Sequence, residues 1–249
     1  MLTRRRITLT LASLLAAGRV HALEDEPLLW VSGEVPPFLS QGPQGPQGYA
    51  FELYERVCRQ AELDAKLRFY PWARAMRMVL SSQAHAGLVV ARSPDRESRF
   101  QWLFPVGSFR FAIFTRPEDG PMPAHVEAFR SKRIGSLRAS ASRELLNGIG
   151  MMNVVEGKDY PELLALLQRG VVDAVIGPEP VMRALLTQSR SSPLPRSTVL
   201  DRNLSLYAVA GPAMPEDVHR RLVAAYQQLV DNGFVAQLKK RHPEAFFDD

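Results

Sequence analysis

Short apolar runs and amphipathic segments alternate along the first hundred residues, and their two periods predict strands and helices in turn. The expected elements are strands at 28–31, 67–70 and 87–91 and helices at 49–60 and 71–80. A strand, helix, strand, helix, strand order predicts a parallel sheet with right-handed crossovers. Ligands bind beyond the carboxyl ends of such strands. We therefore expect segments 34–38, 71–72 and 91–96 to meet at one site.

A second series with the same pattern follows an apolar, aromatic strand at 109–115 and a turn-rich break at 117–123. Its expected elements are strands at 131–137, 152–156, 171–176, 198–200 and 204–210 and helices at 142–149, 160–169, 180–188, 215–232 and 234–241. One apolar strand leads into this series and one returns. The pattern predicts an α/β protein of two lobes: residues 23–110 and 205–249 form the first, and 111–204 the second. A cleft between them would close by hinge motion.

The first 22 residues have the pattern of a secretory signal. Three arginines, Arg4 to Arg6, precede an apolar run at 7–17 and a small-residue exit, and cleavage is expected after Ala22. An amphipathic helix of the folded protein is the alternative, and general and twin-arginine export both remain open. No window reaches the eighteen apolar residues of a membrane span.

Charge and motifs exclude several classes of function. The chain has a formal net charge of +5, but four arginines and no acids lie in residues 1–22, so the remainder carries about +1. That balance gives no support for nucleic-acid binding. Cys58 falls on the apolar face of a helix, and the five histidines lack metal or triad spacing. We expect no cofactor, no metal and no enzyme activity.

Two polar segments are candidates for binding a ligand. After the strand at 87–91, the run Ser93-Pro94-Asp95 has the chemistry of a helix start, and Arg96 follows as a planar, permanently charged group suited to a carboxylate. A solvated basic face is the alternative. Ser140 opens a serine-rich helix start that would offer donors to a polar ligand, or would act as a plain helix cap.

Five short motifs, in order between residues 35 and 174, resemble bacterial extracellular solute-binding proteins of family 3. They are Val35-Pro36-Pro37-Phe38 with the GYAFEL run at 48–53, Pro71-Trp72 with Arg74, the SPDR run at 93–96 with Trp102 and Pro105, IGSLRAS at 134–140, and LQRGVVDA at 167–174. The resemblance implies a two-lobed type II periplasmic binding protein fold. It also implies a periplasmic monomer that delivers a small solute to the membrane permease of an ABC importer.

The resemblance also assigns residues to the site. Arg96 would grip a ligand carboxylate, the Ala91 backbone N–H would assist, and Ser140 would donate from the second lobe. The aspartate that holds an α-ammonium in the family is replaced here by Pro178, and the usual stacking ring before the proline pair is replaced by Val35. An amino-acid ligand therefore needs another anion.

We add four candidates from the residues themselves. Trp72 would form an apolar wall and Arg74 a second cation, although core and surface roles are the alternatives. Glu34 or Glu179 would supply the counter-charge for an ammonium group. Two other functions stay open: an enzyme resembling cyclohexadienyl dehydratases, with one of these glutamates as general acid, and a sensory or orphan receptor.

Overall fold

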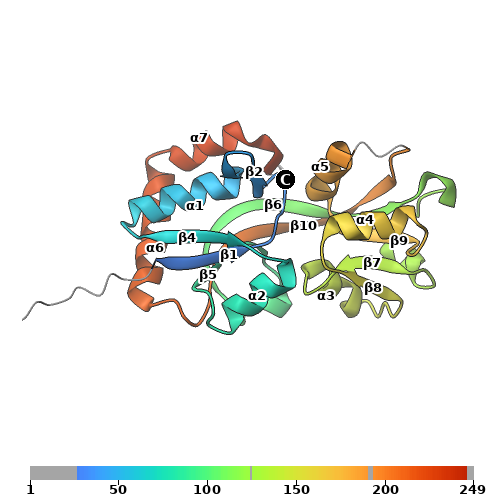
Figure 1. Ribbon diagram of the computed structural model, residues 1–249, viewed down its shortest axis with the longest axis horizontal. Coiled ribbons are helices and arrows are strands. Elements are labelled where there is room, and N and C mark those ends of the chain that lie inside the picture. Colours follow the sequence, from blue (N-terminus) through green and yellow to red (C-terminus); the bar gives the residue numbers. More distant parts are fainter. Residues whose placement is uncertain (1–26, 124, 190–192, 246–249) are drawn as a thin grey trace, which may run out of the picture.

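The computed structural model describes residues 27–123, 125–189 and 193–245 and has two lobes joined by two long strands (Figure 1). The expected signal at residues 1–22 lies outside the described residues. One sheet of eight strands runs through both lobes in the order β4-β1-β5-β10-β6-β9-β7-β8. The strands are β1 (Leu28–Ser32), β4 (Ala65–Phe69), β5 (Ala86–Ala91), β6 (Gln101–Thr115), β7 (Ile134–Leu137), β8 (Val154–Gly157), β9 (Ala174–Pro178) and β10 (Arg196–Ala210).

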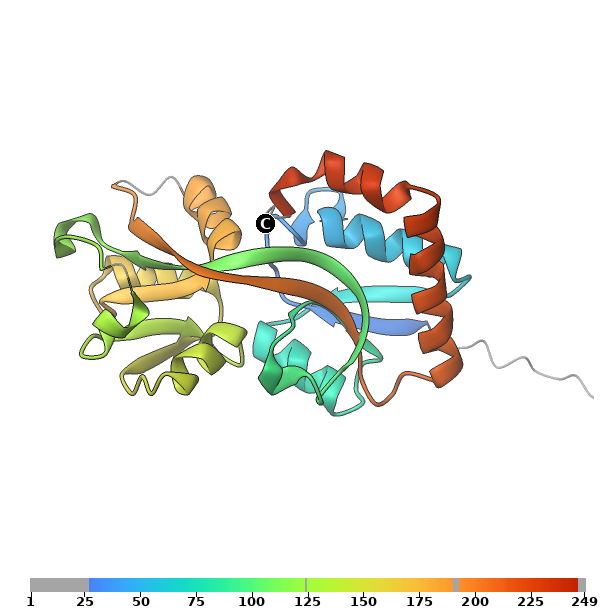
Figure 2. The same cartoon turned by 180° about the vertical axis from the view of Figure 1, so that it is seen from behind.

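Helices cover both faces of the sheet in each lobe (Figures 1 and 2). In the first lobe they are α1 (Tyr49–Gln60), α2 (Trp72–Leu80), α6 (Glu216–Asp231) and α7 (Phe234–Arg241). In the second lobe they are α3 (Ala141–Gly148), α4 (Tyr160–Gln168) and α5 (Glu179–Ser189). Four short 3-10 helices complete the set: η1 (Pro94–Arg96), η2 (Pro117–Asp119), η3 (Val126–Phe129) and η4 (Pro243–Ala245). No helix among the described residues is long and apolar enough to cross a membrane.

Parallel pairing holds within each lobe, as the alternation of strands and helices predicts. Strand β1 lies between β4 and β5, and β7 lies between β8 and β9, with all four pairs parallel. Strands β6 and β10 are antiparallel to each other along their length and pair with β5 on one side and β9 on the other. The carboxyl ends of the parallel strands of both lobes therefore face the space between the lobes.

The two crossing strands are longer than the sequence pattern predicts. Each has 15 residues, whereas strands were expected only at 109–115, 198–200 and 204–210. Pro105 and Gly107 break the local pattern, but both pair with β10 across irregularities in the register. Gly107 has φ 142°, and a side chain there would meet the Ala245 carbonyl oxygen at 2.9 Å. This crowding explains why a residue disfavoured in strands stands in one.

The Gly/Pro/Gln segment at 41–48 was expected to be a loop and instead contains part of a hairpin. Strands β2 (Ser40–Gly42) and β3 (Gly45–Gln47) pair antiparallel, with Gly42 opposite Gly45. Gly45 has φ 119°, a conformation that glycine adopts without steric cost. Glycine and proline residues of the kind that predict a loop therefore also permit this tight hairpin turn.

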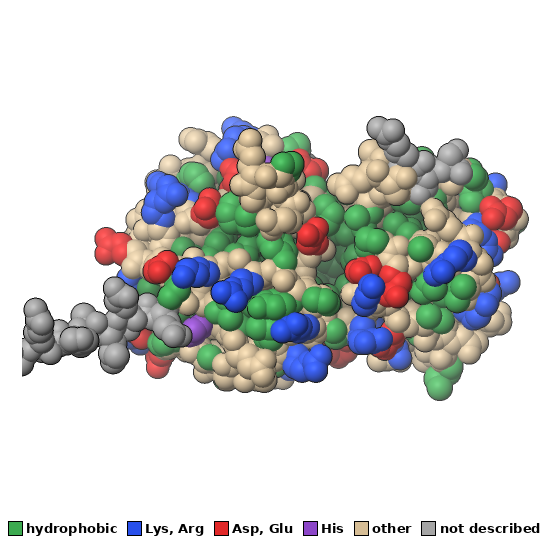
Figure 3. Space-filling view, in the orientation of Figure 1, with side chains coloured by type: hydrophobic (Ala, Val, Ile, Leu, Met, Phe, Trp, Pro, Cys, Tyr) green, Lys and Arg blue, Asp and Glu red, His purple; other side chains and the backbone are tan. Residues whose placement is uncertain are grey.

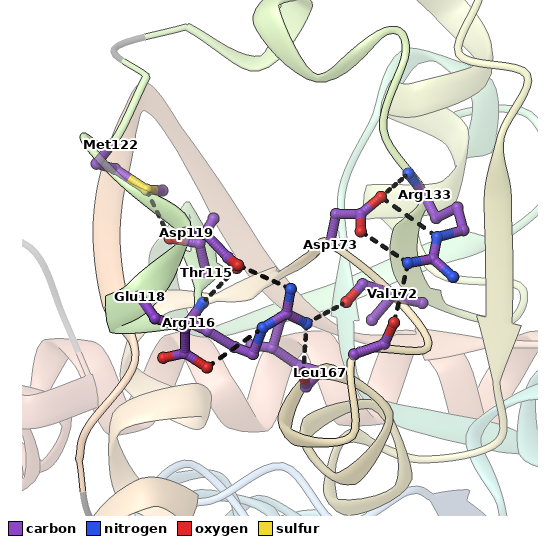
Figure 4. Close-up of polar contacts among 10 residues, drawn as sticks. Thr115, Arg116, Glu118, Asp119, Met122, Arg133, Leu167, Val172 and Asp173 are labelled. Atoms are coloured by element: carbon purple, nitrogen blue, oxygen red, sulfur yellow. Dashed lines mark hydrogen bonds and ion pairs between the residues drawn. The ribbon is translucent and has the colours of Figure 1, made fainter.

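Polar contacts fasten the far end of the second lobe, away from the cleft (Figure 4). Arg116, directly after β6, donates to the Leu167 and Val172 carbonyl oxygens at 2.9 and 3.0 Å. Arg133 and Asp173 form an ion pair at 2.8 Å between the starts of β7 and β9. These contacts are structural and leave the cleft to other residues.

Candidate ligand-binding site

A cavity of about 50 Å³ lies between the lobes, where the carboxyl ends of the strands converge. Figure 3 shows the surface hollowed between the lobes, with hydrophobic side chains along the hollow. The cavity is lined by Glu34, Val35, Phe38, Trp72, Val89, Ala91, Arg96, Phe109, Phe111, Leu137, Ser140, Ala141, Ser142, Tyr160, Pro178 and Leu206. That volume has room for a few water molecules.

Arg96 is the buried cation of the cavity, with only 2% of its surface exposed. It ends η1, the short helix that begins at Pro94 as the sequence predicts. Its Nε donates to both carboxylate oxygens of Glu144 at 2.9 and 3.0 Å, and its Nη2 donates to the Ala139 carbonyl oxygen at 2.9 Å. Its Nη1 is buried without a hydrogen-bond partner among the described residues. An unsatisfied donor of this kind typically costs about 1–3 kcal/mol.

Ala91 and Ser140 both lie on the cavity wall. Ala91 is the last residue of β5 and pairs with Leu206 of β10. Ser140 is the N-cap of α3, where its Oγ accepts from the Arg143 backbone N–H at 3.2 Å and donates to the Leu137 carbonyl oxygen at 2.6 Å. Its proton is therefore already engaged within the second lobe, so the capping role is present even though the residue lines the cavity.

Of the two candidates on α2, Trp72 lines the cavity and Arg74 does not. Trp72 begins α2, is 9% exposed, lines the cavity and donates from Nε1 to the Ala139 carbonyl oxygen at 3.0 Å across the cleft. Arg74 is exposed and lies over the Tyr70 ring, 4.7 Å from its centroid. It is absent from the cavity wall, because two residues along a helix turn a side chain by about 200°.

The two candidate counter-charges also differ in place. Glu34 follows β1, is exposed and lines the cavity, and it forms no ion pair with any described residue. Glu179 begins α5 and pairs with Arg183 one turn later, and Pro178 lines the cavity in its stead. Of these two carboxylates, Glu34 is the one available to a ligand.

A second, larger chamber of about 350 Å³ adjoins the cavity. The two spaces share Glu34, Trp72, Leu137 and Tyr160 in their walls. The chamber adds the rings of Phe69 and Tyr70 and the polar residues Lys158 and Asp159. It forms the aromatic, solvent-side part of the same cleft.

No protein-family model matches the chain, and a search of curated proteins finds no match. Solved structures do match. A histidine kinase sensor domain with similarity to periplasmic binding proteins has a TM-score of 0.78 at 17% identity, covering 87% of this chain and 95% of that one. The arginine-, lysine-, histidine-binding protein ArtJ of Geobacillus stearothermophilus has a TM-score of 0.73 at 16% identity, covering 87% and 94%. An ancestral arginine-binding protein bound to arginine has a TM-score of 0.76 at 13% identity, covering 87% and 97%.

The chain has the type II periplasmic binding protein fold. The fold class expected from the sequence is thereby confirmed. In this fold the cavity around Arg96 lies between the lobes at the carboxyl ends of the strands, where doubly wound sheets bind ligands.

Among the residues of this site that sequence reasoning missed, three take part in polar contacts or line both spaces: Ala139, Glu144 and Tyr160. An acid in the first turn of a helix usually interacts with the helix dipole, so Glu144 carries no separate signal. Tyr160 begins α4 and fits its apolar face, yet it lines both spaces, and burial raises the pKa of its hydroxyl while the charge of Arg96 opposes that rise. The contacts of Ala139, Glu144 and Tyr160 at the site are visible only when the two lobes are placed together in the structure.

Proposed function

We propose that the protein is a periplasmic solute receptor that closes on a small, carboxylate-bearing, amino-acid-like molecule and delivers it to an ABC-type importer. The observation that carries the proposal is the unpartnered Nη1 of Arg96, buried in the wall of an interlobe cavity. A buried guanidinium N–H that lacks an acceptor in a cleft between two lobes is suited to an oxygen of a ligand carboxylate.

The amino end of the ligand is proposed to lie near Glu34. Pro178 removes the carboxylate that the family resemblance implies, and Glu179 is engaged with Arg183. Glu34 lines both the cavity and the outer chamber, so an ammonium group close to Arg96 could reach it without burying an unpaired charge.

The body of the ligand is proposed to occupy the outer chamber. Phe69, Tyr70, Trp72 and Tyr160 present aromatic rings there, and the chamber is several times larger than the cavity. Aromatic walls favour a planar, apolar or cationic group. Amino acids are reasonable first candidates, because solved neighbours include arginine-binding proteins and a GluR0 ligand-binding core from Nostoc punctiforme in complex with glutamate.

Closure is proposed to occur by bending of the crossing strands. The expected lobe boundaries at 110/111 and 204/205 fall within β6 and β10, beside the register irregularity between Val199 and Asn203. Such irregularities weaken the ladder locally and permit a hinge.

The test is a thermal-shift and calorimetry screen of residues 23–249 against amino acids, keto acids, polyamines, short peptides and aromatic carboxylates. A ligand at 100 times its Kd stabilises the protein by about 2.7 kcal/mol. At this chain length that corresponds to a shift of roughly 5–10 °C.

Arg96→Ala should abolish the shift given by every carboxylate hit, and Arg96→Lys, which keeps the charge without the planar fork, should weaken it. Arg92→Ala is the matched control, because Arg92 pairs with Glu97 on the surface, outside the cavity wall. Hits that survive in Arg96→Ala would contradict the proposal.

A sensory receptor is the second candidate, because the histidine kinase sensor domain has the same fold at a TM-score of 0.78. It predicts the same binding without uptake. Transport of a labelled ligand that stops when the gene is deleted would favour the importer, and unchanged uptake would favour the sensor. The described neighbours are binding proteins and ligand-binding domains, which favours binding over the dehydratase-like alternative.

A further inference from the structure

Glu144 of the second lobe already pairs with the cation that the proposed ligand needs. Both of its carboxylate oxygens accept from Arg96 Nε, and one of them also accepts from the Ser93 hydroxyl at 3.1 Å. Arg99 lies 4.0 Å away. The negative charge of Glu144 therefore largely balances the positive charge of Arg96 in the cavity wall.

All of these partners of Glu144 belong to the first lobe, although Glu144 is on α3 in the second. The preceding residue behaves differently: Arg143 pairs with Glu156 of its own lobe at 2.9 Å. Opening the cleft therefore separates the Glu144 carboxylate from every polar partner that it has among the described residues. Together with the bonds from Trp72 and Arg96 to the Ala139 carbonyl oxygen, its contacts hold the lobes together.

The charge around the cleft follows from this pairing. Three cations, Arg96, Arg99 and Lys158, face three carboxylates, Glu34, Glu144 and Asp159, at or beside the two spaces, so the charges there balance. A second carboxylate brought to Arg96 would be repelled by Glu144, and the guanidinium edge formed by Nε is closed to it. A ligand oxygen finds a guanidinium nitrogen without a partner among the described residues at Nη1.

We propose that Glu144 is a specificity-determining residue that balances Arg96, helps to hold the cleft closed and restricts the site to ligands without net negative charge. The part of this inference that concerns the ligand rests on the proposed function, and the part that concerns closing of the cleft does not. The ligand class is then zwitterionic or cationic: one carboxylate on Arg96 Nη1 and an ammonium group near Glu34.

The test compares L-glutamine and L-glutamate, which differ in one charge at similar size, in the wild type, Glu144→Gln and the control Glu156→Gln. Glu156 is a carboxylate of the same lobe that pairs with Arg138 and Arg143 and is absent from the cavity walls. The ratio of the two Kd values is the readout, because the cost of closing the lobes is common to both ligands and cancels.

The wild type is expected to favour glutamine, and Glu144→Gln is expected to improve glutamate relative to glutamine by about threefold, because one negative charge beside the cleft is lost. Glu156→Gln should leave the ratio unchanged. A wild type that favours glutamate, or a ratio that Glu144→Gln changes by less than twofold, would overturn the proposal.

A second measurement needs no ligand. Fluorophores on the two lobes report their separation, and Glu144→Ala should raise the ratio of open to closed molecules by about tenfold because charge-assisted bonds between the lobes are lost. An unchanged distance distribution would overturn the closing role. If neither amino acid binds but Glu144→Ala opens the cleft, the closing role stands, and the ratio is measured instead on the neutral and the anionic hit of most similar size from the screen.

Discussion

Ala139 has a left-handed backbone, φ 56°, at the point where the second lobe meets Arg96 and Trp72. Its exposed side chain disfavours that conformation, whereas glycine adopts it readily. We predict that Ala139→Gly raises the free energy of unfolding by about 1 kcal/mol. Ala165→Gly, within α4, should lower it by about 1 kcal/mol. Urea denaturation measures both, and a destabilised Ala139→Gly would contradict the strain.

Single residues differ in how far their roles could be predicted. Arg96 could be placed because Ser93-Pro94-Asp95 signals a helix start directly after a strand, and both signals are local. Glu144 could not, since its hydrogen-bond partners Ser93 and Arg96 lie 51 and 48 residues away on the other lobe. Arg74 shows the converse: its helix was predicted, but the direction of its side chain depends on which face α2 buries.

At the scale of elements, the Arg133–Asp173 pair joins the starts of β7 and β9 (Figure 4). The hydrogen bonds from Arg133 lower the pKa of Asp173, so the pair stabilises the fold above the unfolded pKa of about 3.9 and loses that contribution as the pH falls below it. Asp173→Asn should cost about 1 kcal/mol at pH 7 and less at pH 3, given the partial exposure of the pair.

Urea denaturation at both pH values checks this difference. Glu55→Gln is the control, because Glu55 is exposed in the middle of α1 and should change stability little at either pH. An equal cost for Asp173→Asn at pH 7 and pH 3 would show that the carboxylate charge plays no part.

The elements themselves were predictable where burial has a local period. Helices α1, α2 and α6 and strands β1, β5 and β7 fall close to their expected positions, since each buries one stripe or a continuous apolar run. The crossing strands were underestimated because Pro105 and Gly107 act as breakers locally, while pairing with β10 keeps them in the sheet.

At the scale of the molecule, the two-lobed division followed from two βα series joined by two apolar strands. The contacts within the cleft could not be predicted from the sequence, because they form only where residues of both lobes meet. The proposed receptor, which opens to admit its ligand and closes over it, rests on the small cavity between the lobes, on the Arg96 Nη1 that has no partner among the described residues, and on the interlobe bonds of Glu144.

The most direct test of this account is a crystal structure of the protein with its tightest-binding ligand from the screen. We predict a ligand carboxylate within hydrogen-bond distance of Arg96 Nη1, an ammonium group near Glu34 and the body of the ligand against Trp72 and Tyr160. A ligand bound outside the cleft, or inside it with no contact to Arg96, would contradict the account.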